Sequence, residues 1–410
     1  MSVPKRPVSF PALLLFALVT LWLLVVSAAA FHWLFLEENM GVWAWSTYPW
    51  MISWPGYYVR RGLVGEVIQL LSHAFNVDPR VTILAIYLTL SAIFAYCMVR
   101  VSAGQPLLAL AILGSSFGMA FNVVDAGSTL RHESFFLAAY SAFCLAVVRE
   151  RHRLALAIMT ASALLLPLIH EGIALYFPFF LLVWQVLGNG PAGAERMARG
   201  IGLLWAAVML VTGVLAMKAG GEDTVRDICR EISSVAGDWD WPGRCEDAPP
   251  LWFYRNNGLR TAIHYVLEYL VHGVLNGHVA AIYTFAMTWL ITFALSDIQF
   301  LAGHLLRARR TLFAAFVVPM VLFILGVDWA RWVHAYHLSL GILVISLSVR
   351  HSQAESSSGI AGTWRSIAVA LLVAQPLFVG MHHLYGQREG LAVWFGKLAK
   401  DKLMAMVAGG

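Results

Sequence analysis

Long apolar runs, each close to the length that crosses a lipid bilayer, are the feature that most constrains this chain. A spanning helix needs roughly 20 apolar residues. The runs have approximate limits at 9–31, 80–99, 106–123, 134–148, 154–170, 173–188, 200–217, 279–296, 311–327, 335–349 and 366–383. Charged residues make up only 12% of the chain, about half their usual share in a soluble domain. The sequence predicts an all-α integral membrane protein with about 11 transmembrane helices, in a single polytopic domain over residues 1–410.

The basic residues fall in alternate connections between these runs. These connections are short and poor in acids, and they hold Lys5, Arg6, Arg100, Arg149, Arg151, Arg153, Arg196, Arg199, Arg307, Arg309, Arg310, Arg350 and Arg365. Connections of this kind stay on the cytoplasmic side of a membrane. The net charge of +5 is then a topology signal and predicts no nucleic-acid partner. We expect a bacterial inner-membrane protein with a cytoplasmic N-terminus and a periplasmic or extracellular C-terminus.

Two of the connections expected to face outward are long, at 32–79 and 218–278, and each contains an amphipathic pattern. Tyr57–Asn76 has an apolar stripe at helical spacing and an opposing polar one, made respectively of Val64, Ile68, Leu71 and Phe75, and of Gly62, Gly65, Glu66, Gln69 and His73. Leu259–His278 has a polar residue at every fourth position from Arg260 to Asn276. This second segment could instead be an extra span, which would place Arg307–Arg310 outside, against the charge bias. We interpret both segments as outer-face amphipathic helices.

The four cysteines divide into two pairs. Cys97 and Cys144 lie inside apolar runs and are expected to be small core residues. Cys229 and Cys245 lie 16 positions apart in the long outer connection, where an oxidising compartment would favour a disulfide. The chain contains no Cys-x-x-Cys and no His-Glu-x-x-His string. We therefore predict neither a metal site nor a cofactor.

Ionisable residues gather at the expected outer ends of several spans, where such groups are costly unless they are paired or functional. The string DAGSTLRHES contains Asp125, Arg131, His132 and Glu133. Asp125, Ser128 or Thr129 could cap the next helix, with Glu133 in its first turn. That interpretation leaves Arg131 and His132 beside Glu133 unexplained, so we favour a functional role for the group.

Two further turns have the same character. His170 and Glu171 interrupt two apolar runs, which indicates a polar cavity; the expected partners of Glu171 are Arg131 or Arg331. Asp328, Arg331 and His334 are spaced three apart and could share a helix face. Alternatively, Asp328 and Arg331 form an ordinary ion pair, while Trp329 and Trp332 join an interfacial aromatic belt.

Arg60 and Arg61 are adjacent on the face where basic residues are disfavoured. Arginine offers a planar fork of donors that suits phosphate, so the pair predicts either a lipid-headgroup anchor or a site for a phosphorylated lipid substrate. Glu37 and Glu38, just beyond the first span, are either ordinary loop charge or part of the same site.

With these residues in place, the chain resembles bacterial multi-pass glycosyltransferases of the GT-C type and the related exopolysaccharide and O-antigen polymerases. The layout of spans and long outer loops carries the resemblance. The strings Arg60-Arg61-Gly62-Leu63, His170-Glu171 and Asp328-Trp329-Ala330-Arg331-Trp332 look like strings in membrane proteins of polysaccharide clusters. GT-C enzymes keep an acid in the first outer loop, where this chain has Glu37 and Glu38 without the usual Asp-containing string.

The resemblance implies transfer of a sugar from a polyprenyl-phosphate or -diphosphate donor at the outer face. The implied catalytic residues are Glu171, Glu133, Asp328, Asp125, His170 and His132, and the implied substrate-binding residues are Arg60, Arg61, Arg131, Arg331, His334 and Glu38. One carboxylate would act as general base, and a histidine would orient it or shuttle a proton. The implied partners are membrane lipids, the polyprenyl-linked saccharide and other polysaccharide-export components. The alternatives are a transporter or flippase of a lipid-linked saccharide, a glycan O-acyltransferase and an assembly subunit.

Overall fold

The computed structural model describes most of the chain. It covers residues 9–36, 44–59, 61–125, 128–188, 192–218, 220–236, 245–247, 251, 255, 263–264, 266–268, 275–295, 298–325, 328–352, 362–382 and 386–389. Three residues singled out in the sequence, Glu37, Glu38 and Arg60, lie outside this described part, and so does most of the predicted helix Leu259–His278.

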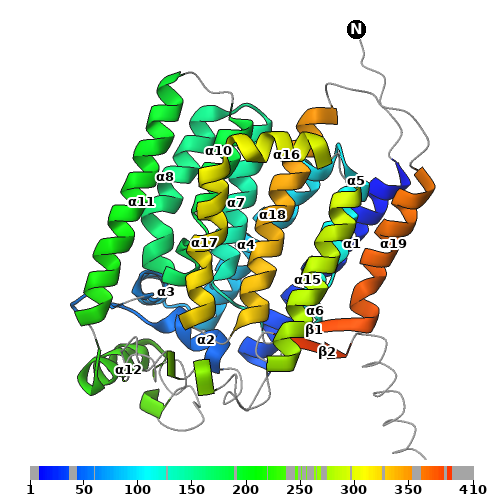
Figure 1. Cartoon of the computed structure of the whole chain (residues 1–410). Helices are drawn as coiled ribbons and strands as arrows, with labels where there is room; N and C mark the ends of the chain where they lie inside the picture. The colour runs from blue at the N-terminus through cyan, green and yellow to red at the C-terminus, as the bar shows by residue number, and fades with distance from the viewer. Residues whose placement is uncertain are drawn as a thin grey trace, which may run out of the picture.

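The described chain is a bundle of apolar helices (Figure 1). The long helices are α1 (Phe10–Phe35), α4 (Pro79–Ser102), α7 (Glu133–Val148), α8 (His152–Ile169), α11 (Ala192–Lys218), α15 (Leu275–Leu295), α17 (Arg309–Leu325), α18 (Trp329–Ser352) and α19 (Gly362–Phe378). Shorter pieces are α5 (Pro106–Gly114), α6 (Ala120–Val124), α9 (Glu171–Ala174) and α10 (Pro178–Leu187). Within the described part, 5 helices are long and apolar enough to cross a membrane: α1, α4, α8, α11 and α18.

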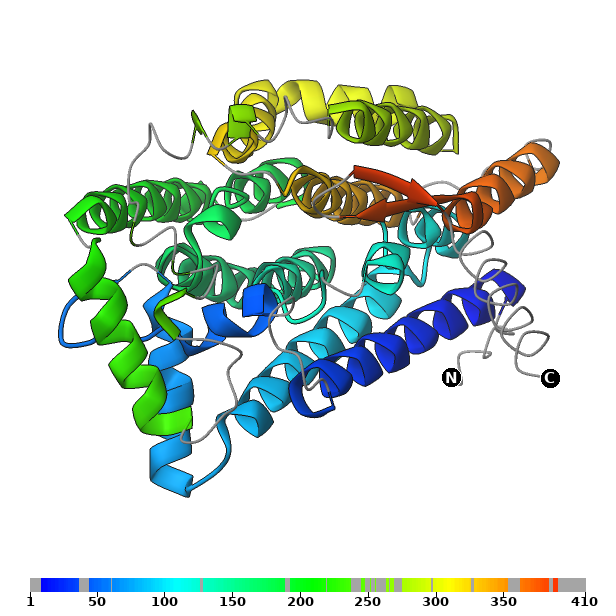
Figure 2. The ribbon, with the colours of Figure 1, turned by 90° about the horizontal axis from the view of Figure 1, so that it is seen from below.

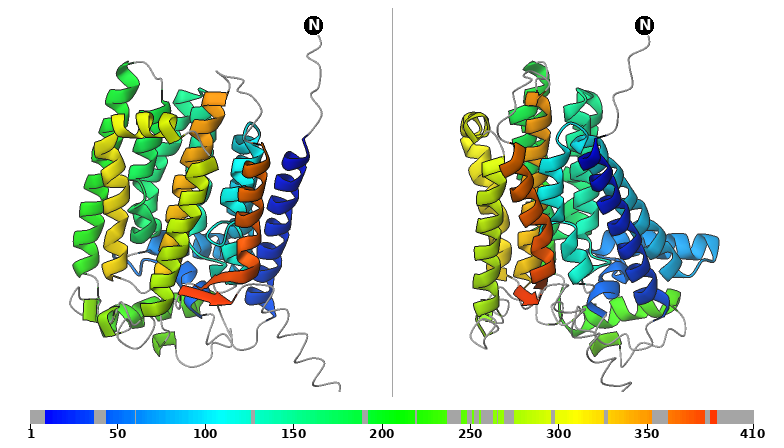
Figure 3. Two further views of the ribbon diagram at one scale, coloured as in Figure 1. Left: turned by 45° about the vertical axis from the view of Figure 1, so that its right-hand side comes forward. Right: turned by 90° about the vertical axis from the view of Figure 1, so that its right-hand side faces the viewer.

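The connections between these helices separate to the two ends of the bundle. One end, here called the site end, carries α2 (Ala44–Met51), α3 (Gly62–Phe75), α6 and α12 (Glu222–Ala236), and it lies at the bottom of Figure 1. The opposite end carries α16 (Ile298–Arg307), which crosses the bundle almost horizontally. Seen from below, α1 and α4 lie along one side and α15 and α17 along the other, with α7 and α18 between them (Figure 2). The side views likewise place α1 and α15 on opposite sides of the bundle (Figure 3).

The predicted span 106–123 is not a continuous helix. α5 ends at Gly114 because Ser115 takes an extended conformation, and the chain turns before α6 begins at Ala120. The turn folds back closely enough that a Cβ on Gly118 would lie 2.3 Å from the carbonyl oxygen of Leu113. The break leaves backbone carbonyls in the bundle interior, where side chains from α18 reach them.

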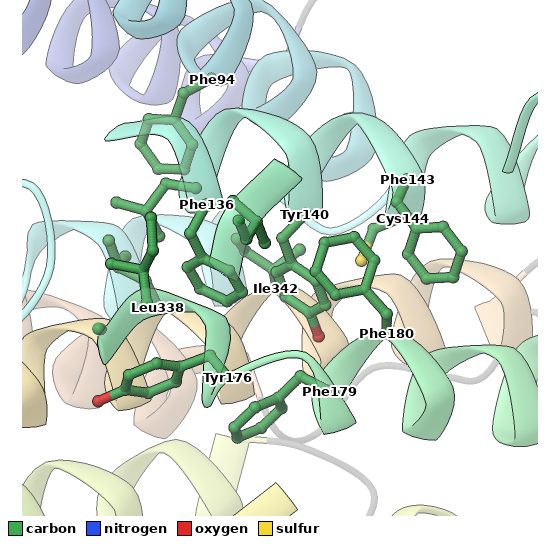
Figure 4. Close-up of a cluster of buried hydrophobic side chains, with 14 of the residues drawn as sticks. Phe94, Phe136, Tyr140, Phe143, Cys144, Tyr176, Phe179, Phe180, Leu338 and Ile342 are labelled. Atoms are coloured by element: carbon green, nitrogen blue, oxygen red, sulfur yellow. The ribbon is translucent and has the colours of Figure 1, made fainter. Parts of the chain in front are cut away.

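A cluster of buried aromatic and aliphatic side chains lies between α7, α10 and α18 (Figure 4). Phe136 and Tyr140 stack at 5.5 Å with an angle of 10° between their rings, and Phe180 meets Tyr140 edge-on at 5.2 Å. The Tyr140 hydroxyl donates a hydrogen bond to the carbonyl of Ser339 on α18. These contacts fix α7 and α18 relative to each other, so that the side chains at their site ends are held in register.

The last predicted span, 366–383, is helical only to Phe378. The chain then forms β1 (Val379–His382), which pairs antiparallel with β2 (Gly386–Glu389) at the site end. This strand pair departs from the predicted all-α fold. Ser116, in the break after α5, donates a hydrogen bond to the Val379 carbonyl, so the two irregular segments support each other.

The helix predicted over Tyr57–Asn76 is present as α3, but its buried face is rotated from the predicted stripe. Gln69, expected on the polar face, is 7% exposed and donates to the Ser53 hydroxyl at 2.7 Å. Phe75, expected on the apolar stripe, is 70% exposed. The cause is close packing of α3 on the preceding loop, because a Cβ on Gly65 would lie 2.0 Å from the Ile52 carbonyl oxygen.

After α11, helix α12 lies at the site end. A disulfide joins Cys229 on α12 to Cys245, and Cys97 and Cys144 are buried and free. The Tyr57 hydroxyl donates to the Asp227 carboxylate at 3.2 Å. α12 is thereby tied to the loop that leads into α3.

Candidate functional site

Four chain segments converge at the site end: the loop before α3, the α6–α7 connection, the α8–α9 turn and the start of α18. Together they bring in most of the polar residues singled out in the sequence. We call this group the polar cluster; it consists of Arg61, Asp125, Arg131, His132, Glu133, His170, Glu171, Asp328, Arg331 and His334.

Arg61 and Glu171 form the more exposed half of the polar cluster. The Arg61 guanidinium donates to Glu171 through both Nε and Nη2, and the shortest distance, Nη2 to Oε1, is 2.6 Å. The side chains are 27% and 37% exposed. The predicted partners of Glu171, Arg131 and Arg331, are thus not its ion-pair partner. The loop before α3, in which Arg61 has a left-handed backbone conformation with φ 64°, brings the Arg61 guanidinium to the α8–α9 turn.

Arg331 is the centre of the buried half. Its Nη2 lies 2.7 Å from Asp328 Oδ2, which is the predicted pair three residues apart, and its Nε lies 3.0 Å from Glu133 Oε1. The Arg331 and Glu133 side chains are only 8% and 7% exposed. The Nε and Oε1 atoms face each other without hydrogen-bond geometry, so both retain hydrogen-bonding capacity. Trp332 is buried beneath the Arg331 guanidinium at 4.4 Å and does not belong to a surface belt.

His132 and His170 lie between the two halves, with ring centroids 5.8 Å apart. Burial lowers the pKa of His132 to about 3, and the neighbouring Arg61 and Arg131 act in the same direction. Burial and Arg61 likewise hold the pKa of His170 well below its ordinary value. His170 Nδ1 accepts a hydrogen bond from the Gly172 N–H at 3.0 Å. Both rings are therefore neutral near pH 7, and the hydrogen on His170 is carried by Nε2.

Arg131 lies beside Arg331, a like charge. Burial lowers the pKa of Arg131 to about 10, and Arg331 lowers it further, against the opposing effect of Asp328, Glu133 and Asp125. Arg131 precedes α7, in which Glu133 stands in the first turn as predicted; the predicted cap by Asp125, Ser128 or Thr129 is wrong, because the N-cap residue is His132 and no side chain caps the helix. Leu130, just before Arg131, is buried in the left-handed region at φ 58°. Strained backbone of this kind is typical of functional sites.

A cavity of about 40 Å³ opens between α1, α4, α6, α7 and α18, next to the buried half. Its polar lining includes Arg131, Glu133, Arg331 and His334. Its apolar wall is formed by Trp22, Tyr87, Leu90, Phe94, Phe121 and Leu137. Trp22 lies near the middle of α1, and its buried Nε1 has no hydrogen-bond partner within the described part of the chain. The cavity thus combines charged groups with an aromatic wall and an unused donor, a composition suited to a polar ligand that carries an apolar portion.

The structure therefore gathers all the predicted site residues that it describes into one group, while Arg60 and Glu38 lie outside the described residues. Sequence reasoning missed the cavity wall. Trp22 and Phe94 look like ordinary residues of apolar runs. Asn122, an amide inside an apolar run that also lines the cavity, was an available signal.

Residues 16–236 match a protein family described as uncharacterised membrane protein Rv1490. This match covers more than half of the chain. The chain belongs to the Rv1490 membrane-protein family. The matched part of this Rv1490-family chain contains Arg61, His132 and Glu171 but ends before α18, which supplies Arg331. No curated protein and no solved structure matches the chain.

Proposed function

We propose that this protein is a membrane glycosyltransferase or polysaccharide polymerase that uses a polyprenyl-phosphate- or polyprenyl-diphosphate-linked sugar. The observation that carries the proposal is the cavity, in which Arg131 and Arg331 lie beside an aromatic wall. A lipid-linked sugar phosphate needs cationic donors for its phosphate and apolar surface for its chain, and the cavity offers both.

In this proposal Arg131 and Arg331 bind the phosphate oxygens. Arg131 is half-buried and Arg331 is buried, and the two like charges interact, so an anion between them would relieve the repulsion that lowers the pKa of Arg131. Glu133 and Asp328 keep Arg331 oriented in the absence of the ligand. As negative charge develops on the departing phosphate, the same arginines stabilise it.

The more exposed Arg61 and Glu171 form the side on which a glycan acceptor arrives from water. Glu171 would bind acceptor hydroxyl groups while Nε and Nη2 of Arg61 hold its carboxylate in place. Arg61→Lys is expected to impair transfer, because a lysine ammonium cannot make this contact through two nitrogens.

We further propose that the site end faces outward across the bacterial inner membrane. Four shorter apolar segments, α17 and the interrupted α5–α6 segment would cross it together with the five long helices, giving eleven spans. The basic connections then lie on the cytoplasmic side, as the positive-inside rule favours. The segments Glu133–Val148, Glu171–Leu187, Val279–Phe293 and Ile367–Phe378 are apolar enough to contribute. Reporter fusions at Gly220 should be active only outside the cytoplasm; cytoplasmic activity would refute this orientation.

The decisive experiment supplies the purified protein in nanodiscs with a pool of polyprenyl-linked saccharides. Release of polyprenyl phosphate or diphosphate, together with a lengthened glycan, would support the proposal. Arg331→Gln should abolish that release, whereas Arg226→Gln, an exposed arginine on α12, serves as the matched control and should leave it unchanged. Intact donor after prolonged incubation with the unaltered protein would refute the proposal.

A transporter of lipid-linked saccharide is the second candidate, and the break between α5 and α6 favours it. Transporters place interrupted helices and polar groups deep in the membrane, and Ser115, Ser116 and His337 are buried at this break. Proteoliposomes separate the two candidates. Movement of a fluorescent polyprenyl-linked sugar between leaflets with its glycosidic bond intact identifies a transporter, and cleavage of that bond identifies a transferase.

A further inference from the structure

A hydrogen bond to the backbone determines which ring nitrogen of His334 carries the hydrogen. His334 Nδ1 lies 2.7 Å from the carbonyl oxygen of Phe117. A carbonyl oxygen can only accept a hydrogen bond, so Nδ1 must carry the hydrogen. In a neutral ring the other nitrogen, Nε2, is then unprotonated and presents a lone pair. This carbonyl belongs to the break between α5 and α6, so the interrupted helix selects the tautomer of His334.

The orientation of the ring is fixed as well. His334 stacks on Phe121 with ring centroids 4.5 Å apart and an angle of 19° between the planes. The side chain is 3% exposed, and His334 lines the cavity together with Arg131, Glu133 and Arg331. With Nδ1 bound to the backbone, Nε2 is the ring nitrogen left to meet a ligand in that cavity.

The other candidate proton acceptors of the polar cluster serve as the counter-ion of an arginine or do not line the cavity. Glu171 accepts hydrogen bonds from Nε and Nη2 of Arg61, and Glu133 is the counter-ion of Arg331. His170 uses Nδ1 to accept from Gly172 and therefore offers a donor, and His132 does not line the cavity. Among the described residues, His334 lines the cavity and has an unprotonated ring nitrogen, Nε2, that is fixed by the hydrogen bond of Nδ1.

We propose that His334 Nε2 accepts the proton of the acceptor hydroxyl in the transfer reaction, an inference that rests on the proposed function. The hydroxyl oxygen forms a bond to the anomeric carbon of the donor sugar, and the bond from that carbon to the phosphate oxygen breaks. The electron pair of the broken bond leaves with the polyprenyl phosphate or diphosphate beside Arg131 and Arg331. The hydroxyl proton passes to Nε2, and it leaves for water when the products depart.

The test separates proton transfer from structure and from donor binding. His334→Gln should lower kcat by about 10²–10⁴-fold, the usual range for loss of a general base. Its affinity for polyprenyl phosphate, measured by native mass spectrometry, should stay within about twofold. His73→Gln, at an exposed histidine of α3, is the matched control and should behave as the unaltered protein. His334→Gly should regain turnover when imidazole is added, which a purely structural role would not produce.

Nitrogen-15 NMR of histidine-labelled protein gives a readout independent of turnover. The signal lost in His334→Gln should belong to a ring with protonated Nδ1 and unprotonated Nε2, and a protonated Nε2 would overturn the inference. Full turnover by His334→Gln would overturn the role of His334 as proton acceptor and leave the proposed function intact. Loss of polyprenyl phosphate binding in that variant would have the same consequence. Absence of transfer by the unaltered protein would refute the proposed function, and the role of His334 as base with it.

Discussion

Replacing Arg331 by methionine tests whether the buried half of the polar cluster is held together by charge compensation. The substitution keeps a long side chain over Trp332 but removes the only cation that the structure pairs with both Glu133 and Asp328 among the described residues. Glu133 is 7% exposed, so its carboxylate would lose its ion-pair partner in a place that water scarcely reaches.

Removing one partner of a buried ion pair costs about 3–5 kcal/mol of stability. Two features reduce that figure here. Asp328 is 23% exposed and can regain some hydration, and Arg131 lies close enough to interact electrostatically with both carboxylates. We therefore expect Arg331→Met to lower the free energy of unfolding by about 2–3 kcal/mol. Adding Glu133→Gln should restore more than half of this loss, because the uncompensated charge is then gone.

The assay is equilibrium unfolding in mixed micelles, followed by tryptophan fluorescence, for both single variants and the double variant. A double-mutant cycle with Arg61→Met and Glu171→Gln serves for comparison. Because that ion pair is partly exposed, its coupling free energy should be at most about 1 kcal/mol. Additive effects of Arg331→Met and Glu133→Gln would refute the reasoning, as would an Arg331→Met protein as stable as the unaltered one.

Three further predictions follow from other contacts. Glu171→Gln should fold normally, with a loss of less than about 1 kcal/mol, yet raise the KM for the glycan acceptor; a fully active variant with unchanged KM would contradict its role. Cys229→Ser with Cys245→Ser should cost about 3 kcal/mol by loop-closure entropy, and thiol reagents should label neither cysteine of the unaltered protein before reduction. Gly65→Ala should cost about 1–3 kcal/mol through overlap with the preceding loop, whereas Gly200→Ala, which meets open space in α11, should leave the melting temperature unchanged or raise it.

The positions of the helices could be predicted from the sequence because bilayer length and hydropathy alone set them. Helices α4, α7, α8 and α17 begin and end within a few residues of the predicted limits. The disulfide pairing was also within reach, because Cys229 and Cys245 are the two cysteines of one polar connection. The pairing of Asp328 with Arg331 follows from helical spacing, so it too could be anticipated.

The partner of Glu171 could not be predicted, because it depends on how a loop packs and not on periodicity. Arg61 reaches Glu171 only because α3 lies tightly against the segment before it, which the two glycines Gly62 and Gly65 permit. Hydropathy likewise cannot reveal the break after α5, since the residues on both sides are apolar. The cavity depends on that break and on Trp22, which lies near the start of the matched family segment and far in sequence from α6, α7 and α18.

The interruption of α5 and the polar residues of α18 make physical sense only together. Arg331, His334 and His337 follow one another at three-residue intervals, so each side chain is turned by about 60° from the one before and meets a different neighbour. Arg331 meets Glu133 on α7, whereas His334 and His337 lie 2.7 and 2.8 Å from the carbonyls of Phe117 and Ile112 at the two sides of the break. A continuous α5 helix would have used its carbonyls internally, and the buried His334 and His337 would then have lost these carbonyl acceptors. The interrupted helix thus allows α18 to carry polar groups into the bundle, with the tautomer of the histidine nearest the cavity already determined.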